Sequence, residues 1–139
     1  MITSKKRKYK VLTNNPLVAE KLADTDLEVD CLALSFEGLL KAVRDEVHLG
    51  SHLLTHPLSG SVKPGETPYK SVLLVIRRGK TDIQSLRLIE NALLTCRKFP
   101  LREGKMDPAV DRDFQLIDWT LFSSGLQALD GSYQADEID

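Results

Sequence analysis

The sequence predicts a small three-layer α/β domain in which a short parallel sheet carries helices on both of its faces. Three segments, residues 9–13, 27–33 and 71–77, have the apolar or alternating pattern of strands. Helical patterns stand between and after these segments, and this alternation is typical of parallel sheets with right-handed crossovers. The last two helical patterns follow the third strand and add two C-terminal helices to the expected fold.

The residues between the first strand and the first helix mark where one ends and the other begins. The apolar run 9–13 is stopped by Asn14-Asn15-Pro16. Asn15 is a good N-cap because its side chain can accept a hydrogen bond from a free backbone N–H, and Pro16 suits the first helical position. A short helix is therefore expected over residues 16–23.

The next segments fix the expected strand order. Residues 27–33 alternate between apolar and acidic side chains at first, which indicates a strand with one partly wet face at a sheet edge. Ser35 caps a helix with a continuous apolar face, and Gly50 ends it. The run 71–77 is almost wholly apolar, as in a strand that is covered on both faces. The order 2-1-3 then places the two most apolar strands together.

Two helices are expected after the third strand. Thr81 and Gln84 form a capping-box sequence that opens the first of them, and Asp107 with Pro108 opens the second. The second helix has two apolar stripes, so it needs two neighbours. Core packing on both sides is one interpretation, and a homodimer interface within residues 107–129 is the other. The stripes consist of Val110, Phe114, Ile117 and Leu121, and of Trp119, Phe122, Leu126 and Leu129.

Length and charge limit the class of protein. A chain of 139 residues favours one domain over residues 1–139, with flexible tails at 1–8 and 130–139. The formal net charge of −1 argues against a nucleic-acid or anionic-membrane surface, which would need a basic excess. No apolar run could span a bilayer and no signal peptide is present, so we expect a cytoplasmic protein without a membrane partner.

Residues 50–70 are the most unusual part of the chain. A loop of about 20 residues is uncommon in a compact domain and is usually functional or disordered. Its leucines and Tyr69 provide apolar anchors, so we expect it to be ordered. Gly60 between two serines lets backbone N–H groups converge on an anion, Lys63 adds a positive charge, and His56 can donate or accept a hydrogen bond near neutral pH. The alternative is a turn-rich loop that is packed for structural reasons alone.

A candidate site for phosphate or carboxylate follows from this loop. Ligands of open parallel sheets lie beyond the carboxyl ends of the strands, where Asn14 and Asn15 are expected. By the same rule, residues 77–80 (Arg-Arg-Gly-Lys) would share that edge, and the long loop would enter the third strand from the opposite end. The candidate ligand-binding residues are Asn14, Asn15, His56, Ser59, Gly60, Ser61 and Lys63.

Other kinds of site are not supported. Histidines at 48, 52 and 56 have the spacing of a helical metal face, but Gly50 interrupts the helix and converging further ligands are missing, so no metal is expected. Cys31 and Cys96 lack CxxC partners and are interpreted as reduced core residues. A dinucleotide fingerprint and a nucleophile elbow are also absent, so no cofactor is expected and catalytic residues are unknown.

Three stretches of the chain together resemble the GrdX family, small proteins encoded with the glycine, sarcosine and betaine reductase genes of amino-acid-fermenting anaerobic bacteria. They are residues 11–18, the Arg44-Asp45 helix end with residues 48–64, and residues 66–71. The resemblance covers residues 9–80, and the C-terminal helices carry no matching motif. It implies a cytoplasmic accessory role near a selenoprotein reductase system and brings no catalytic residues with it. The chain has no selenocysteine-type motif of its own, so it resembles a helper rather than the reductase.

Three hypotheses of function stay open at this point. The first is a non-catalytic accessory or regulatory protein that binds a small anion or a reductase component through residues 52–70. The second is a small enzyme that acts on a phosphorylated or carboxylated metabolite, with His56 as acid/base and Lys63 stabilising charge. The third is an interaction module whose C-terminal helix pairs with a partner or with a second copy. Whether the chain is an enzyme is therefore uncertain.

Overall fold

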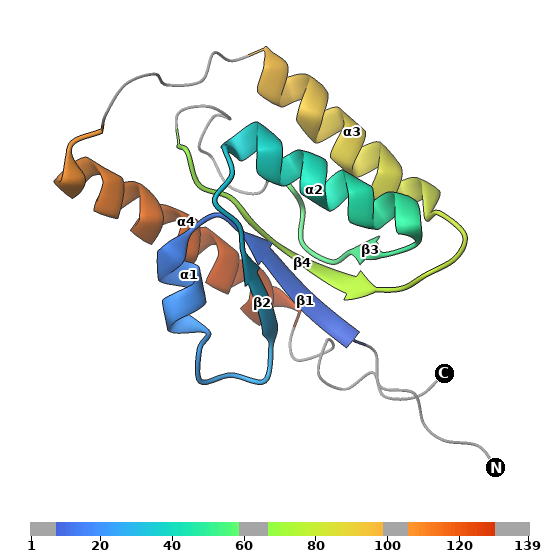
Figure 1. Ribbon diagram of the computed structural model, residues 1–139, viewed down its shortest axis with the longest axis horizontal. Coiled ribbons are helices and arrows are strands. Elements are labelled where there is room, and N and C mark those ends of the chain that lie inside the picture. Colours follow the sequence, from blue (N-terminus) through green and yellow to red (C-terminus); the bar gives the residue numbers. More distant parts are fainter. Residues whose placement is uncertain (1–7, 59–66, 99–105, 130–139) are drawn as a thin grey trace.

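The computed structural model describes residues 8–58, 67–98 and 106–129, and within them the α/β class is confirmed (Figure 1). Lys8 already belongs to the first strand, and the rest of the predicted tails, 1–7 and 130–139, lies outside the described residues. The elements are β1 (Lys8–Thr13), α1 (Pro16–Lys21), β2 (Glu28–Cys31), α2 (Phe36–Leu49), β3 (His52–Leu53), β4 (Ser71–Ile76), α3 (Ile83–Arg97) and α4 (Pro108–Ala128).

The sheet has the order β2-β1-β4-β3, and it is mixed. The three strands expected from the sequence are neighbours in the predicted order, but only β1 and β2 are parallel. The prediction of a fully parallel sheet was wrong, because β4 runs antiparallel to both β1 and β3. The cause is β3, two residues that no strand pattern marked. β3 follows α2 and runs in the same direction as β1. It therefore carries the chain to the carboxyl end of β1, and β4 returns from there in the opposite direction.

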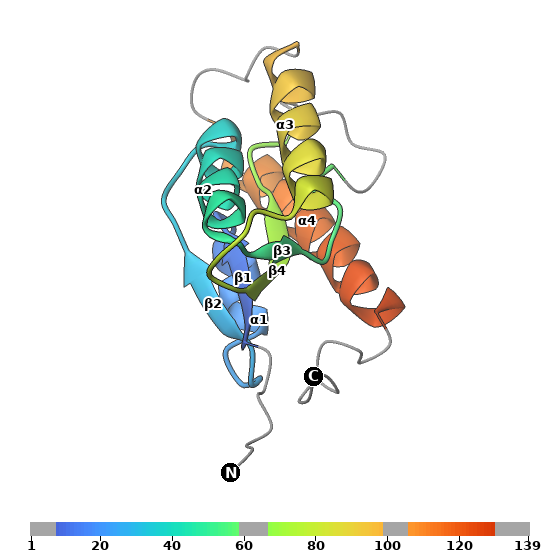
Figure 2. The same ribbon diagram turned by 90° about the vertical axis from the view of Figure 1, so that its right-hand side faces the viewer.

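Two helices cover each face of the sheet (Figures 1 and 2). On one face, Leu12, Val72 and Leu74 of the sheet pack with the buried faces of α2 and α3. On the other, Val11 and Leu73 pack with α1 and α4. Successive side chains of a strand point to opposite faces. Burial on both faces therefore explains the continuous apolar run of β4.

The helix ends follow the predicted chemistry with one change. Asn15, Ser35 and Asp107 cap α1, α2 and α4, each accepting a backbone N–H with its side-chain oxygen. The predicted capping box at Thr81 was displaced by one residue, since the carboxylate of Asp82 accepts from the backbone N–H of Ser85 at 3.1 Å. The Thr81 hydroxyl instead donates to the carbonyl of His48, which ties the start of α3 to the end of α2.

The end of α2 lies against the turn that follows β4. Gly50 has a φ of 120°, and a Cβ built on it would lie 2.8 Å from the backbone nitrogen of Gly79. The N–H of Gly79 donates to the carbonyl of Leu49 at 2.9 Å. The predicted stop at Gly50 is thus confirmed, and only glycine fits it because a side chain would collide with the neighbouring backbone.

The two cysteines differ in environment. Cys96 of α3 is buried in the core that α3 shares with α2 and the sheet, as expected. Cys31 is exposed, so its interpretation as a core residue was wrong. The reason is its position, at the last residue of β2 and on the edge of the sheet, where one side of the strand has no neighbour.

Candidate functional site

The carboxyl edge of β1 is the place where the long loop returns to the sheet. Thr13 pairs with Ser71, the first residue of β4. Residues 67–70 therefore lie beside Asn14 and Asn15, on the edge that the sequence singled out. The prediction that the loop would enter its strand from the opposite end was wrong, because β4 is antiparallel.

Residues 77–80 lie at the other end of the sheet for the same reason, and their expected place beside Asn14 was also wrong. There Arg78 forms an ion pair with Glu46 of α2 at 3.1 Å. The hydroxyl of Ser51 donates to the same carboxylate at 2.9 Å. These contacts fasten the end of α2 to the turn after β4, so the arginine serves the packing of that corner.

Asn14 joins three separate segments at the carboxyl edge. Its amide Nδ2 donates to the carbonyls of Leu34 at 2.9 Å and of Pro68 at 2.8 Å. Its Oδ1 accepts from the backbone N–H of Lys70 at 2.8 Å. Both amide protons are used in this way, so the side chain holds the end of the long loop against the segment that follows β2. Ligand binding by Asn14 stays a prediction.

Asn15 is completely buried and connects α1 with α4. Its Oδ1 accepts from the N–H of Leu17 at 3.0 Å, which is the cap of α1. Its Nδ2 donates to the carbonyl of Gln115 at 2.9 Å and to Oδ2 of Asp118 at 3.0 Å. A ligand would have to displace these bonds to reach the amide, so the geometry makes Asn15 a structural link, and its ligand role stays a prediction.

A buried polar network extends from Asp118. Oδ2 of Asp118 accepts from the hydroxyl of Ser71 at 2.8 Å, and the Ser71 hydroxyl lies 2.6 Å from that of Thr13. The Thr13 hydroxyl also accepts from the backbone N–H of Asn15 at 2.9 Å. Burial raises the pKa of Asp118, and the hydrogen bonds from Asn15 and Ser71 act against this rise. The network thus holds a carboxylate inside the protein between the sheet and α4.

Lys70 brings a second buried charge to this network. Only 6% of it is exposed, against 5% of Asp118. Burial lowers the pKa of Lys70, and the charge of Asp118 acts in the opposite direction. The sequence analysis missed both residues. The available signal was Asp118 itself, a carboxylate four residues before Phe122 and eight before Leu126, on the buried face of the helix.

The end of the long loop is also fastened to the first turns of α4. The hydroxyl of Tyr69 donates to Oδ1 of Asp111 at 2.6 Å. The side-chain amide of Gln115 donates to the other oxygen of Asp111 at 3.0 Å and to the Tyr69 hydroxyl at 3.3 Å. Burial, followed by the bond to Asp111, raises the pKa of Tyr69, so the phenol stays a donor at neutral pH. Tyr69 therefore anchors the loop through its hydroxyl group, whereas the sequence predicted an apolar anchor.

His56 belongs to the beginning of the same loop and is exposed. The preceding residue, Thr55, is buried, and its hydroxyl accepts from the N–H of Leu73 at 3.0 Å. The backbone N–H of Leu58 donates to Nδ1 of His56 at 3.0 Å. A neutral imidazole whose Nδ1 accepts a hydrogen bond carries its proton on Nε2. His56 thus offers an N–H donor to solvent.

The other predicted loop ligands, Ser59, Gly60, Ser61 and Lys63, lie outside the described residues. Of the remaining histidines, His48 is exposed on α2. Nδ1 of His52 lies 3.8 Å from Oδ2 of Asp82, a distance that forms an ion pair when the ring is protonated. The three histidines therefore have three different environments. In residues 8–58, 67–98 and 106–129, no three metal-binding side chains lie together.

The fold defines a small α/β protein with a mixed sheet. At the edge where many parallel sheets bind ligands, Asn14 joins the neighbouring segments, and the buried side chains of Asp118 and Lys70 lie behind it. A family model, GrdX-like protein, matches residues 10–127. The chain belongs to the GrdX-like family, which confirms the resemblance and extends it over the C-terminal helices. Comparisons with curated proteins and with solved structures give no significant match.

Proposed function

We propose that this chain is a cytoplasmic accessory or regulatory protein of the glycine, sarcosine and betaine reductase system, which binds a small anionic ligand or a reductase component through residues 52–70. Membership of the GrdX-like family supports the reductase context. No helix in the described part of the chain is long and apolar enough to cross a membrane.

The observation that carries this proposal is the anchoring of the loop at both ends around an exposed histidine. At the start, Leu54 donates its N–H to the carbonyl of Leu73 at 2.9 Å, and Thr55 is bonded to the same residue. At the end, Lys70 is bonded to Asn14, and Tyr69 to Asp111. The two described ends of the loop are thus fixed to the sheet and to α4, and binding residues commonly lie on loops that a rigid scaffold positions.

The chemistry of His56 favours anion binding over general-base catalysis. The Nε2–H of this exposed ring can donate a hydrogen bond to a ligand, while Nδ1 already accepts from the backbone N–H of Leu58. A general base needs a free lone pair, so this tautomer serves better as a donor to phosphate or carboxylate. In the proposal, Ser59, Gly60, Ser61 and Lys63 supply the remaining donors, and Asn14 holds the end of the loop through its bonds to Pro68 and Lys70.

Thermal unfolding in the presence of candidate ligands tests the proposal. Phosphate, acetyl phosphate, glycine and nucleotides are each added to the full chain. A ligand at about 100 times its Kd stabilises the folded state by about 2.7 kcal/mol, which raises Tm by several degrees. His56→Ala and Lys63→Ala should abolish the rise, whereas His48→Ala, an exposed histidine on α2, should keep it.

Two results would contradict a small-ligand site. One is an unchanged Tm with every compound, and the other is a rise that His56→Ala and Lys63→Ala leave intact. Binding of purified reductase components to the immobilised chain then tests the partner arm, with the same variants. Turnover of any compound that raises Tm would instead support the small-enzyme alternative with His56 as acid/base.

A second candidate function is the interaction module, and an observation on α4 favours it. Val110, Leu116 and Ile117 are large apolar side chains, and 38%, 53% and 39% of them are exposed. The second stripe, with Phe122 and Leu126, is buried against the sheet. Two members of the first stripe, Val110 and Ile117, are therefore exposed, and exposed apolar side chains that share one helix face mark interaction surfaces.

A further inference from the structure

The exposed stripe of α4 has the spacing of a coiled-coil seam. Its members recur at intervals of four and three residues, the pattern of heptad a and d positions. Phe114 and Leu121 are half-buried, and the other members are exposed. The seam consists of Val110, Phe114, Ile117, Leu121, Ser124 and Ala128.

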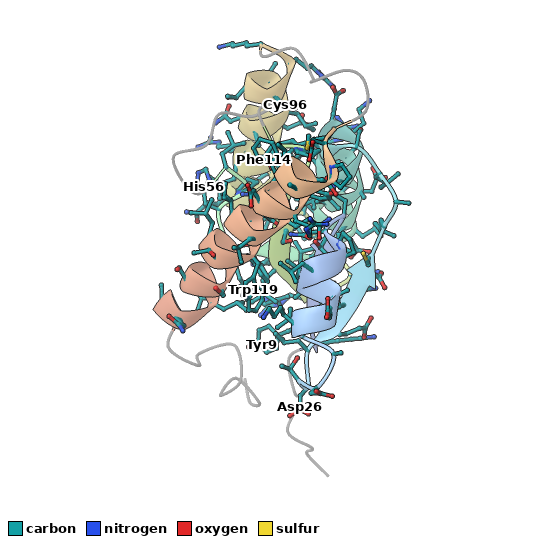
Figure 3. All side chains as sticks on the ribbon, turned by 90° about the vertical axis from the view of Figure 1, so that its left-hand side faces the viewer. Tyr9, Asp26, His56, Cys96, Phe114 and Trp119 are labelled. Atoms are coloured by element: carbon teal, nitrogen blue, oxygen red, sulfur yellow. The ribbon has the colours of Figure 1, made fainter. Side chains whose placement is uncertain are left out.

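The exposed members of the seam, Val110, Ile117, Ser124 and Ala128, lie on the flank of α4 that is turned away from α1. Figure 3 shows α4 with α1 along one side and Trp119 labelled close to α1. At about 100° per residue, Ile117 lies about 200° around the helix from Trp119, on the opposite flank. The seam and the buried face of Asp118, Phe122 and Leu126 are about 120° apart. A helix that packs on the seam would therefore not displace the buried face of α4 from the sheet.

We propose that two copies of this chain associate through their α4 helices, packed antiparallel along this seam. In a two-fold pair, a residue i contacts j and j contacts i. The seam satisfies this rule with complementary sizes when the helices run in opposite directions. Val110 then meets Ala128 of the second copy, Phe114 meets Ser124, and Ile117 meets Leu121.

The sizes select the antiparallel direction. A parallel pair would place Phe114 against its own counterpart and Ser124 against a second serine. One end of the seam would then be overfilled and the other would contain gaps, and both defects cost stability. The antiparallel register instead puts one large and one small side chain in each outer layer, which favours a uniform helix spacing.

The charges of α4 select the same direction. The charged residues of α4 all lie between Asp111 and Asp118, and residues 119–129 carry no charge. Antiparallel packing sets Asp113, which flanks the seam, against the uncharged half of the second copy. Parallel packing would bring the charged halves of the two helices together and would also align the two helix dipoles. In the antiparallel pair, Asp113 faces the uncharged Gln127 of the second copy.

A seam of one helix from each copy is a small interface, so association should depend on concentration. Light scattering of the full chain over about a hundredfold range of concentration should show the mass rise from 15.6 kDa toward twice that value. Ile117→Lys, in the middle of the seam, should keep the mass at one chain at every concentration. Leu116→Lys is the matched control, because Leu116 is more exposed and lies off the seam.

Cross-linking with a short bismaleimide tests the direction, in a Cys31→Ser background that removes the exposed thiol. Thr120→Cys lies close to the two-fold axis of the antiparallel pair, so it should cross-link. Ser124→Cys faces Phe114 of the second copy and should not, although it would cross-link in a parallel pair. Circular dichroism and Tm of each variant establish that it is folded.

Three results would overturn the pairing. They are a single-chain mass at all concentrations, equal disruption by Leu116→Lys and Ile117→Lys, and cross-linking through Ser124→Cys in place of Thr120→Cys. A single-chain mass together with a reductase component whose binding Ile117→Lys abolishes would assign the seam to that component. The pairing does not depend on what residues 52–70 bind, so the ligand tests can fail while this one succeeds.

Discussion

Nδ2 of Asn15 donates to Oδ2 of Asp118 at 3.0 Å, and this bond joins the cap of α1 to the middle of α4. The two residues are 103 positions apart in sequence. The same carboxylate oxygen accepts from Ser71, so one buried oxygen links α1, β4 and α4. The layer of helices on that face is therefore held by a polar group as well as by apolar packing.

Replacing Asp118 should destabilise the fold strongly. Asp118→Ala leaves the buried Asn15 amide and the Ser71 hydroxyl without this acceptor. A buried donor that loses its acceptor costs about 1–3 kcal/mol, so the two together should cost several kcal/mol. Urea unfolding measures the loss, with Asp113→Ala, exposed on the same helix, as the control that should change stability by less than about 0.5 kcal/mol. Equal losses would refute this role.

The stability of the protein should also depend on the charge of Asp118. Burial raises its pKa, so the folded chain binds a proton there more tightly than the unfolded chain. Such a group stabilises the fold below its unfolded pKa, and the contribution is lost as pH rises through the folded pKa. The free energy of unfolding of the native chain, relative to Asp118→Asn, should therefore increase from neutral pH to about pH 4. A constant difference would show that the pKa is not raised.

Asn14 should matter through the loop that it holds. Asn14→Ala removes bonds to Leu34, Pro68 and Lys70. At about 1 kcal/mol net for each hydrogen bond, the loss should be about 2–4 kcal/mol, with faster amide exchange in residues 67–70. Asn91→Ala, exposed on α3, is the control. Unchanged exchange in residues 67–70 would argue that Asn14 does not hold the loop.

Two glycines should respond in opposite ways to alanine. Gly50→Ala is expected to cost more than about 1 kcal/mol, because the position has a φ of 120° and a Cβ would lie 2.8 Å from the nitrogen of Gly79. Gly125→Ala, inside α4 with Thr55 at a comfortable 3.7 Å, should stabilise by about 0.5–1 kcal/mol. Thermal unfolding of both variants measures the signs, and a stabilising Gly50→Ala would contradict the close contact.

The tautomer of His56 can be observed directly. Nitrogen-15 chemical shifts of the ring in the neutral state should identify Nε2 as the protonated nitrogen, because Nδ1 accepts from Leu58. His48, exposed on α2, provides the comparison within the same spectrum. A proton on Nδ1 of His56 would remove the outward donor on which the proposed anion site depends.

Local features were predictable because their causes are local. Asn15 caps α1 and Pro16 begins it, as the sequence predicted, since a cap depends on a few consecutive residues. The second apolar stripe of α4, with Phe122 and Leu126, packs into the core as its pattern predicted. The alternative of an exposed stripe could not be decided from the helix alone, because its exposure depends on the number of neighbours that the fold supplies.

The candidate site was predicted only in part. The position of Asn14 and Asn15 at the carboxyl edge of β1 followed from the strand pattern, whereas the hydroxyl bonds of Tyr69 did not follow from its apolar character. Lys70 and Asp118 were missed, because 48 residues separate two charges that meet only when β4 and α4 pack together. Ser59, Gly60, Ser61 and Lys63 stay predictions.

By itself, the sequence determined the α/β class, the helix ends, the neighbours of the first strand and the family. The tertiary structure decided the direction of β4, and with it the residues that meet at the carboxyl edge. The physical reason is that strand direction depends on where the preceding chain enters the sheet. Two residues, His52 and Leu53, enter the sheet beside β4 and antiparallel to it, and so short a strand leaves no periodic signal.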